Sequence, residues 1–223
     1  MQLDVVSDTV CPWCYVGKRR LDEALVQHGG EGVSLRWRPF QLDASIPDGG
    51  VERKAYMEKK FGADPDRLKA MVGALRNHGD QLGIEFNFDK IKISPNTLDS
   101  HRLIRWAGTA GYQNEMVDVL FRRYFTDGED IGNRAVLLDA ASEAGMDTDI
   151  VEDLLIRGAD RELVQREEAL AREMGIQGVP SFVINEQWVM VGAQETPALV
   201  RMFEKLLEKE AKDAASEAAS TAQ

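Results

Sequence analysis

The residues with the clearest chemical potential are Cys11 and Cys14, the only two cysteines among 223 residues. They stand between a short apolar run and a stretch with helical periodicity. A thiol at the start of a helix lies near unpaired backbone N–H groups and the positive end of the helix dipole, and both favour the thiolate. Because the thiolate is the nucleophile in thiol–disulfide exchange, this spacing predicts a redox-active disulfide.

The order of the two cysteines predicts their roles. Cys11 comes first and is expected to be the nucleophile, because it lies nearest the start of the helix. Cys14 follows one helical turn later and is expected to resolve a mixed disulfide on Cys11. Pro12 and Trp13 lie between them and should shape the site, with Trp13 giving an apolar surface beside the sulfurs.

The sequence gives less support to two structural roles of the cysteine pair, a zinc site and an inert disulfide, than to a redox-active disulfide. A structural zinc site needs four ligands, and only His28, His78 and His101 remain as donors other than carboxylates, so we expect no metal. An inert disulfide is rare in the cytoplasm, where close cysteines are more often redox-active.

Composition and charge narrow the class of protein. The chain is 43% apolar and 29% charged, as soluble globular proteins are. A net charge of −11 argues against a nucleic-acid partner, which would need clustered Lys and Arg. No run approaches the roughly 18 apolar residues of a membrane span. The first residues lack the basic start and long apolar stretch of a secretory signal, which predicts a cytoplasmic location without a membrane partner.

The elements around the cysteines predict a βαβ unit. Residues 3–6 read as a strand, 15–28 as a helix that ends at Gly29, and 33–38 as a half-buried strand that ends at Pro39. Helical periodicity then dominates the middle of the chain, with one extended piece at 84–93. The candidate helices there are 52–61, 65–82, 97–110, 113–125, 134–144 and 148–156.

The C-terminal part returns to mixed structure. A helix over 161–174 precedes a hairpin of 181–184 and 187–191, and a last helix begins near 196. We therefore expect an α/β fold with an inserted all-helical domain. Residues 1–47 and 160–212 would form the discontinuous α/β domain, 48–159 the insertion, and 213–223 a disordered tail.

A second candidate element is Val179-Pro180, immediately before the strand at 181–184. By itself it would be an ordinary proline that opens a strand. Beside a Cys-x-x-Cys helix, we expect this peptide to face the sulfurs, with the Val179 backbone free to pair with an extended substrate.

Other polar residues near the motif leave alternatives open. His101 could form a wall of a substrate groove facing the cysteines, or it could pack at a domain junction. Asp8 could disfavour a nearby thiolate, cap the helix or shuttle a proton. Lys18, Arg19 and Arg20 are expected on the solvated face of the first helix.

Together these segments resemble the DsbA-like thioredoxin-fold superfamily, and most closely its FrnE-like branch. The resemblance covers nearly the whole chain before about residue 212. The matching segments are 7–15 around the cysteines, 37–42, Asn96-Thr97 with His101-Arg102, 178–182 and 192–194.

The resemblance implies a thioredoxin fold interrupted by a helical domain, with a cis proline at Pro180 beside the disulfide. It also implies thiol–disulfide oxidoreductase activity without a bound organic cofactor, on protein or small-molecule thiols and disulfides. The protein would be a monomer or a homodimer.

A sister branch is similar to 2-hydroxychromene-2-carboxylate isomerase and kappa-class glutathione transferase, carries a serine at the first cysteine position and works with glutathione. Cys11 departs from that pattern. The first alternative is a glutathione-dependent isomerase or transferase, and glutathione is a candidate co-substrate. The second alternative is a chaperone-like binding module.

Overall fold

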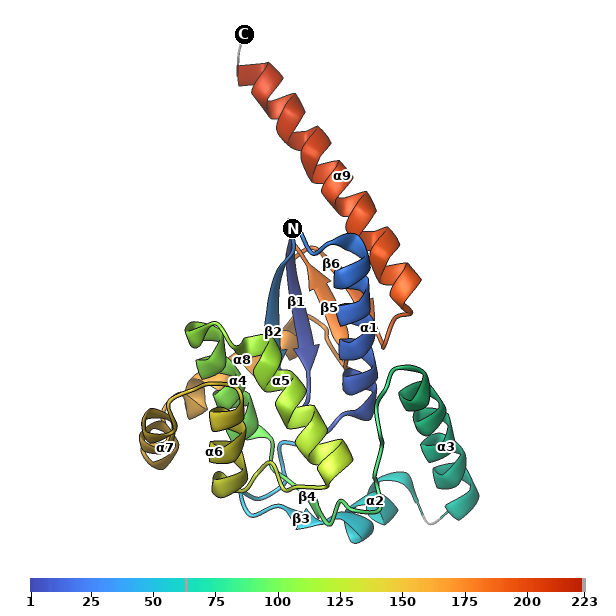
Figure 1. Ribbon diagram of the computed structural model, residues 1–223, viewed down its shortest axis with the longest axis vertical. Coiled ribbons are helices and arrows are strands. Elements are labelled where there is room, and N and C mark those ends of the chain that lie inside the picture. Colours follow the sequence, from blue (N-terminus) through green and yellow to red (C-terminus); the bar gives the residue numbers. More distant parts are fainter. Residues whose placement is uncertain (63, 222–223) are drawn as a thin grey trace.

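A four-stranded sheet forms the centre of the molecule, with the strand order β2-β1-β5-β6 (Figure 1). The computed structural model describes residues 1–62 and 64–221. Strand β1 runs parallel to β2 and antiparallel to β5, and β5 and β6 form a hairpin. These strands are β1 (Gln2–Ser7), β2 (Ser34–Pro39), β5 (Ser181–Ile184) and β6 (Trp188–Val191).

Helices surround the sheet, and most of them lie between β2 and β5 in the chain (Figure 1). A two-stranded ribbon, β3 (Val51–Glu52) with β4 (Ile93–Ser94), ties part of this insertion together. The helices are α1 (Pro12–His28), α2 (Arg53–Phe61), α3 (Pro65–Gln81), α4 (Leu98–Ala110), α5 (Gln113–Arg122), the π-helix η1 (Arg123–Asp127), α6 (Arg134–Glu143), α7 (Thr148–Ile156), α8 (Arg161–Glu173) and α9 (Thr196–Thr221).

Strand β1 is buried on both faces of the sheet, because Leu3 and Val5 on one face and Val6 on the other are apolar, while the buried Asp4 pairs with Arg36. Leu3 and Val5 belong to the main core with residues of α1 and α9. Val6 points the other way and packs in a smaller core with Phe40 and Val183, next to α8. The sheet thus holds the start of α1, which follows β1 directly, in a fixed place.

The insertion shares its core with the α/β part. Tyr15 of α1 stacks on Phe121 of α5, with ring centroids 5.1 Å apart, and Phe125 lies 6.1 Å from the same ring. One core of buried residues therefore runs across the proposed boundary between the two domains. The division into 1–47 with 160–212 and 48–159 follows the course of the chain, and it stays a proposal.

The structure corrects the expected elements at several places. Helix α5 ends at Arg122 and passes into η1, where a single helix to residue 125 was expected. In the extended piece predicted over 84–93, the structure has irregular backbone with a turn at 88–90, and only Ile93 belongs to a strand. Helix α1 begins at Pro12, three residues before the expected start at residue 15. The other boundaries shift by no more than one residue, as end fraying and different assignment rules produce.

The C-terminal segment also differs from expectation. Helix α9 continues to Thr221, where the sequence predicted a disordered tail over 213–223; residues 222–223 lie outside the described part. Five of the eleven residues over 213–223 are alanine, which has the highest helix propensity, so the local sequence favours continuation of the helix. Figure 1 shows this helix projecting from the body of the molecule.

Candidate active site

Cys11 occupies the N-cap position of α1. Its extended backbone, with φ −92° and ψ 111°, places its side chain just outside the helix. Its carbonyl oxygen accepts hydrogen bonds from the N–H groups of Cys14 (3.0 Å) and Tyr15 (3.3 Å), which begins the helix, and Pro12 occupies the first turn. No side chain caps this end, so the positive end of the helix dipole is left to the Cys11 thiol.

The two thiols are free and differ in their surroundings. Cys11 is 5% exposed and Cys14 is 1% exposed. Burial raises the pKa of Cys14 well above its ordinary value, and the neighbouring Cys11 sulfur raises it further. Hydrogen bonds from the Ser7 side chain and the Asp8 backbone oppose part of this effect. Cys14 is therefore held as a neutral thiol.

The loop before β5 brings a backbone carbonyl to the nucleophile. The Val179–Pro180 peptide bond is cis, and the Cys11 thiol lies 3.7 Å from the Val179 oxygen, to which it donates a weak hydrogen bond. The Gly192 N–H donates to the Pro180 oxygen at 2.7 Å and fixes this loop to the end of β6. Gly17 of α1 allows the close approach, since a Cβ there would stand 3.1 Å from Pro180 Cγ.

The inserted helices reach the motif through α3. The Trp13 ring meets the His78 ring edge-on, with centroids 5.3 Å apart. Arg20 lies 3.2 Å from His78 Nδ1, donates to the Ala193 carbonyl at 2.8 Å and pairs with Glu195 at 2.7 Å. Arg20 therefore joins α1, α3 and the loop after β6 around the exposed side of the motif.

The expectation that the cations of α1 form a solvated face is wrong for two of them. Lys18 and Arg20 are each only 4% exposed. Lys18 is accommodated because it pairs with Asp22 at 2.6 Å and Asp118 at 3.3 Å, which compensates for the lost hydration.

Asp8 precedes Cys11 by three residues, accepts a hydrogen bond from the Cys11 N–H through its backbone oxygen at 3.0 Å, and is 1% exposed. Its Oδ2 accepts a hydrogen bond from the Leu42 N–H at 2.7 Å, so its side chain does not cap α1. Among the residues that the structure describes, its Oδ1 has no hydrogen-bond partner, although His101 Nε2 lies 3.5 Å away. A buried carboxylate oxygen without a full partner is uncommon and is free to accept a proton.

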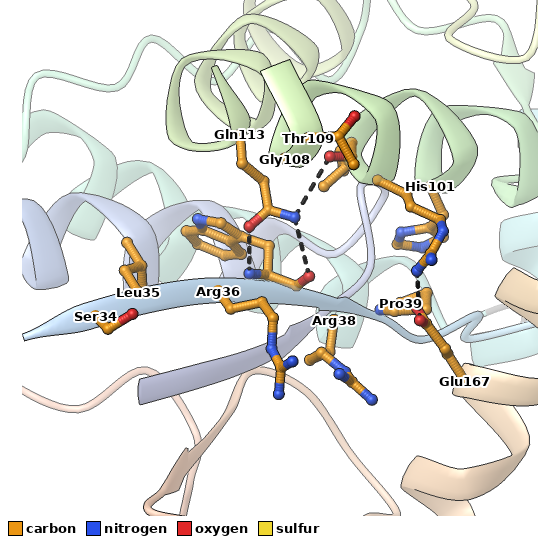
Figure 2. A pocket seen from close by; sticks show the side chains of 13 residues that line it. Ser34, Leu35, Arg36, Arg38, Pro39, His101, Gly108, Thr109, Gln113 and Glu167 are labelled. Atoms are coloured by element: carbon orange, nitrogen blue, oxygen red, sulfur yellow. Dashed lines mark hydrogen bonds and ion pairs between the residues drawn. The ribbon is translucent and has the colours of Figure 1, made fainter. Parts of the chain in front are cut away.

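His101 is buried in the junction between β2 and α4, with 4% of its surface exposed. Its Nε2 lies 3.0 Å from the Phe40 carbonyl oxygen. It also borders a cavity of about 340 Å³ on the outer side of β2, whose lining includes neither cysteine (Figure 2). This position corresponds to the junction alternative and gives a substrate little of its surface to contact.

Tyr124 is a polar residue of this region that the sequence did not single out. It lies in η1, is fully buried and receives a hydrogen bond from Arg53 at 3.0 Å. Burial raises its pKa to about 12, and the nearby charge of Asp8 adds to this effect. The sequence signal was weak because the residue stands in an ordinary helical pattern.

The described residues offer no metal centre: within 1–62 and 64–221, no group of three or more His, Cys, Asp or Glu side chains is arranged to hold an ion. Among the same residues, none of the helices combines the length and apolar character needed to cross a bilayer.

Known proteins share this architecture. The solved structure of a probable DsbA oxidoreductase, SCO1869 from Streptomyces coelicolor, is 27% identical with a TM-score of 0.84, covering 92% of this chain and 89% of its own. The cytosolic disulfide reductase DsbM from Pseudomonas aeruginosa, solved with GSH, is 17% identical with a TM-score of 0.69, covering 93% of this chain and all of its own. The latter likeness concerns the fold alone.

Sequence comparison agrees with the structural likeness. The uncharacterized protein YwbO from Bacillus subtilis strain 168 is 28% identical over 214 residues, which covers 95% of this chain and 98% of that protein. The family model described as the DSBA-like thioredoxin domain matches residues 2–204. The expected α/β thioredoxin-like fold with a helical insertion is thereby confirmed, and the chain belongs to the DSBA-like thioredoxin domain family.

Proposed function

We propose that this protein is a thiol–disulfide oxidoreductase of the DsbA and FrnE type, whose Cys11–Cys14 pair exchanges with the disulfides or thiols of proteins or small molecules. The observation that carries the proposal is the position of Cys11. Its thiol stands at the uncapped start of α1, 3.7 Å from the Val179 carbonyl, with a second, buried thiol one turn behind it.

In the reductive direction, the Cys11 thiolate attacks a substrate disulfide. The S–S bond breaks, one substrate sulfur leaves as a thiolate, and Cys11 holds the other in a mixed disulfide. Cys14 then loses its proton and attacks the Cys11 sulfur, which releases the second substrate thiolate and forms the Cys11–Cys14 disulfide. Two electrons pass from the pair to the substrate, and the oxidative direction reverses these steps.

The second step requires a proton acceptor, because burial holds Cys14 as a thiol. Asp8 supports this role, since its buried Oδ1 has no hydrogen-bond partner among the described residues and its backbone contacts the Cys14 sulfur. We assign Asp8 to accept the Cys14 proton, with the Leu42 N–H as the group that positions the carboxylate through its other oxygen, Oδ2.

The Val179 backbone supports a role in substrate binding. An extended peptide that pairs with this backbone would bring its sulfur to Cys11 without contacts that depend on its sequence. Small disulfides such as oxidised glutathione would need only part of this surface. We propose glutathione as a co-substrate, with no organic cofactor held between turnovers.

The direction of electron flow follows from the reduction potential of the pair relative to its compartment. For a two-electron couple, about 30 mV corresponds to 1.4 kcal/mol, so a glutathione redox titration measures this balance directly. We propose a cytoplasmic reaction without a membrane partner. We also propose that nucleic acid is no partner, since the net charge of −11 disfavours contact with a phosphate backbone.

Trapping tests the mechanism. Cys14→Ser should hold its client on Cys11, because the resolving thiol is gone; incubation with oxidised glutathione should give a stable adduct of one glutathione, identified by mass spectrometry. Cys11→Ser is the matched control and should form no such adduct. Both variants should reduce insulin only at the background rate, and full insulin reduction by Cys11→Ser would contradict the mechanism.

The same variants distinguish the alternatives. A glutathione-dependent isomerase or transferase would keep its glutathione-dependent activity in Cys14→Ser, because it needs no redox turnover. A chaperone-like module would suppress aggregation equally well with both cysteines replaced by serine.

A further inference from the structure

Strand β6, at one edge of the sheet, exposes large apolar side chains. Trp188 is 58% exposed, Val189 47% and Val191 62%. The strand contains no charged residue and no proline, two of the devices by which natural edge strands avoid pairing with other chains. An apolar edge of this kind marks an interaction surface.

The backbone of β6 has hydrogen-bonding groups that face away from β5. Along an antiparallel ladder, hydrogen-bonded pairs alternate with non-bonded pairs. The Gly192 N–H donates to the Pro180 carbonyl, and Val191 and Val189 lie opposite Ser181 and Val183. Val189 and Val191 therefore turn their N–H and C=O groups outward.

One of these outward groups is engaged and three are open. The Gln194 side chain donates to the Val191 oxygen at 2.6 Å, which agrees with an outward carbonyl. Within the described residues β6 pairs with β5 alone, and the Val189 N–H and C=O and the Val191 N–H point away from that ladder. No hydrogen bond from outside the sheet reaches these three groups among the same residues. An added strand would pair with these groups.

The opposite edge of the sheet is protected. On β2, the Trp37 N–H donates to Gln113 Oε1 at 2.9 Å, and Gln113 Nε2 lies 3.4 Å from the Trp37 oxygen, so this side chain replaces a neighbouring strand (Figure 2). Arg36 and Arg38 add charge to the same strand. The contrast shows that the fold closes one edge and leaves β6 available.

We propose that β6 pairs with β6 of a second copy of this chain, antiparallel and about a two-fold axis, to join the two sheets into one. With Met190 on the axis, Val189 lies opposite Val191 of the partner subunit, and the outward groups on both strands face each other. This interface is independent of the thiol chemistry proposed above.

A second copy fits this edge better than a charged partner. Residues 187–192 carry no charge in a chain whose net charge is −11, so two copies meet there without bringing like charges face to face. A strand paired with itself about a two-fold axis is also self-complementary, as dimer interfaces require. Trp188, the largest exposed side chain of the strand, would be covered by the partner.

Sedimentation equilibrium of the full chain over a range of concentrations tests the proposal. We expect a reversible dimer with twice the 24.9 kDa mass of the chain. Val189→Lys places two positive charges across the axis and should raise the dissociation constant on the order of 100-fold or more. Val26→Lys is the control: Val26 is 82% exposed on α1, and its replacement should leave the dimer intact.

Amide hydrogen exchange gives a readout that needs no variant. The Val189 and Val191 amides should become protected as the concentration rises, whereas an unpaired edge would leave them unprotected at every concentration. A wild-type chain that stays monomeric, or a Val189→Lys dimer as tight as the wild type, would overturn the proposal. Insulin reduction by each variant verifies that the site remains folded.

Discussion

At the scale of single residues, the site has two unequal thiols. Cys11 stands at the start of α1 with 5% of its surface exposed, and Cys14 lies behind it at 1%. Burial and the neighbouring sulfur raise the pKa of Cys14, so a smaller fraction is thiolate at neutral pH than for an ordinary cysteine. The resolving step should therefore accelerate as pH rises, and continue to do so above about pH 8.5.

Asp8→Asn tests whether the buried carboxylate takes the Cys14 proton. The Asp8 carboxylate is not among the main causes that raise the pKa of Cys14. Removing its charge should therefore leave the pKa of Cys14 high, and an increased thiolate fraction should not offset the loss of the proton acceptor. We expect resolution of a preformed Cys11 mixed disulfide to slow on the order of 100-fold near neutral pH, and to approach the wild-type rate at high pH.

Stopped-flow release of glutathione from that mixed disulfide, across the pH range, measures this step. Asp153→Asn is the control, because Asp153 is a surface carboxylate that pairs with Arg157. If Asp8→Asn resolved the mixed disulfide at the wild-type rate at every pH, Asp8 would have a structural role only.

At the scale of elements, close contacts position α3 against the rest of the insertion. This helix carries His78, whose ring meets Trp13 of the motif. The next residue, Gly79, lies so near the following segment that a Cβ there would stand 2.7 Å from both the Ile84 carbonyl oxygen and Phe86 Cδ2. Gly73, on the same helix, has nothing within 4 Å of that position.

The two glycines of α3 make a matched pair of substitutions. Gly73→Ala should raise the free energy of unfolding by about 0.5–1 kcal/mol, because alanine has the higher helix propensity. Gly79→Ala gains the same propensity but clashes with backbone, and should lower the free energy of unfolding by about 1–3 kcal/mol. Urea denaturation measures both, and similar effects at the two positions would show that α3 does not pack as described.

At the scale of the whole molecule, the insertion and the α/β part share one core. Phe121 of α5 is fully buried and stacks on Tyr15 of α1, which immediately follows Cys14. Aromatic contacts continue from Tyr15 to Phe86 and Phe125. Separate unfolding of the insertion would expose these rings, so the two parts should unfold together.

Phe121→Ala should therefore lower the stability of the whole chain by about 3–5 kcal/mol, as loss of a buried phenylalanine does. Circular dichroism and tryptophan fluorescence should report one coincident transition in the wild type and in the variant. Ile150→Ala is the control, since Ile150 is 59% exposed. Two separate transitions would show that the insertion is an independent folding unit.

The sequence alone determined the features that depend on neighbouring residues. The Cys11–Cys14 spacing, the apolar alternation of β2 and the Asn185-Glu186 turn between β5 and β6 are local patterns, so the motif and most elements could be predicted from them. Even among these local features, the sequence prediction underestimated helix propensity at the C-terminal end, since the chain after Lys212 continues as helix to Thr221.

Only the tertiary structure decided what depends on contacts between distant segments. It placed the Val179 oxygen at the Cys11 thiol, left one oxygen of Asp8 without a partner and buried Arg20 against His78 and Glu195. It also closed the β2 edge with Gln113 and left β6 open. Burial and hydrogen bonding belong to pairs of groups far apart in the chain, and no local pattern specifies which of them meet.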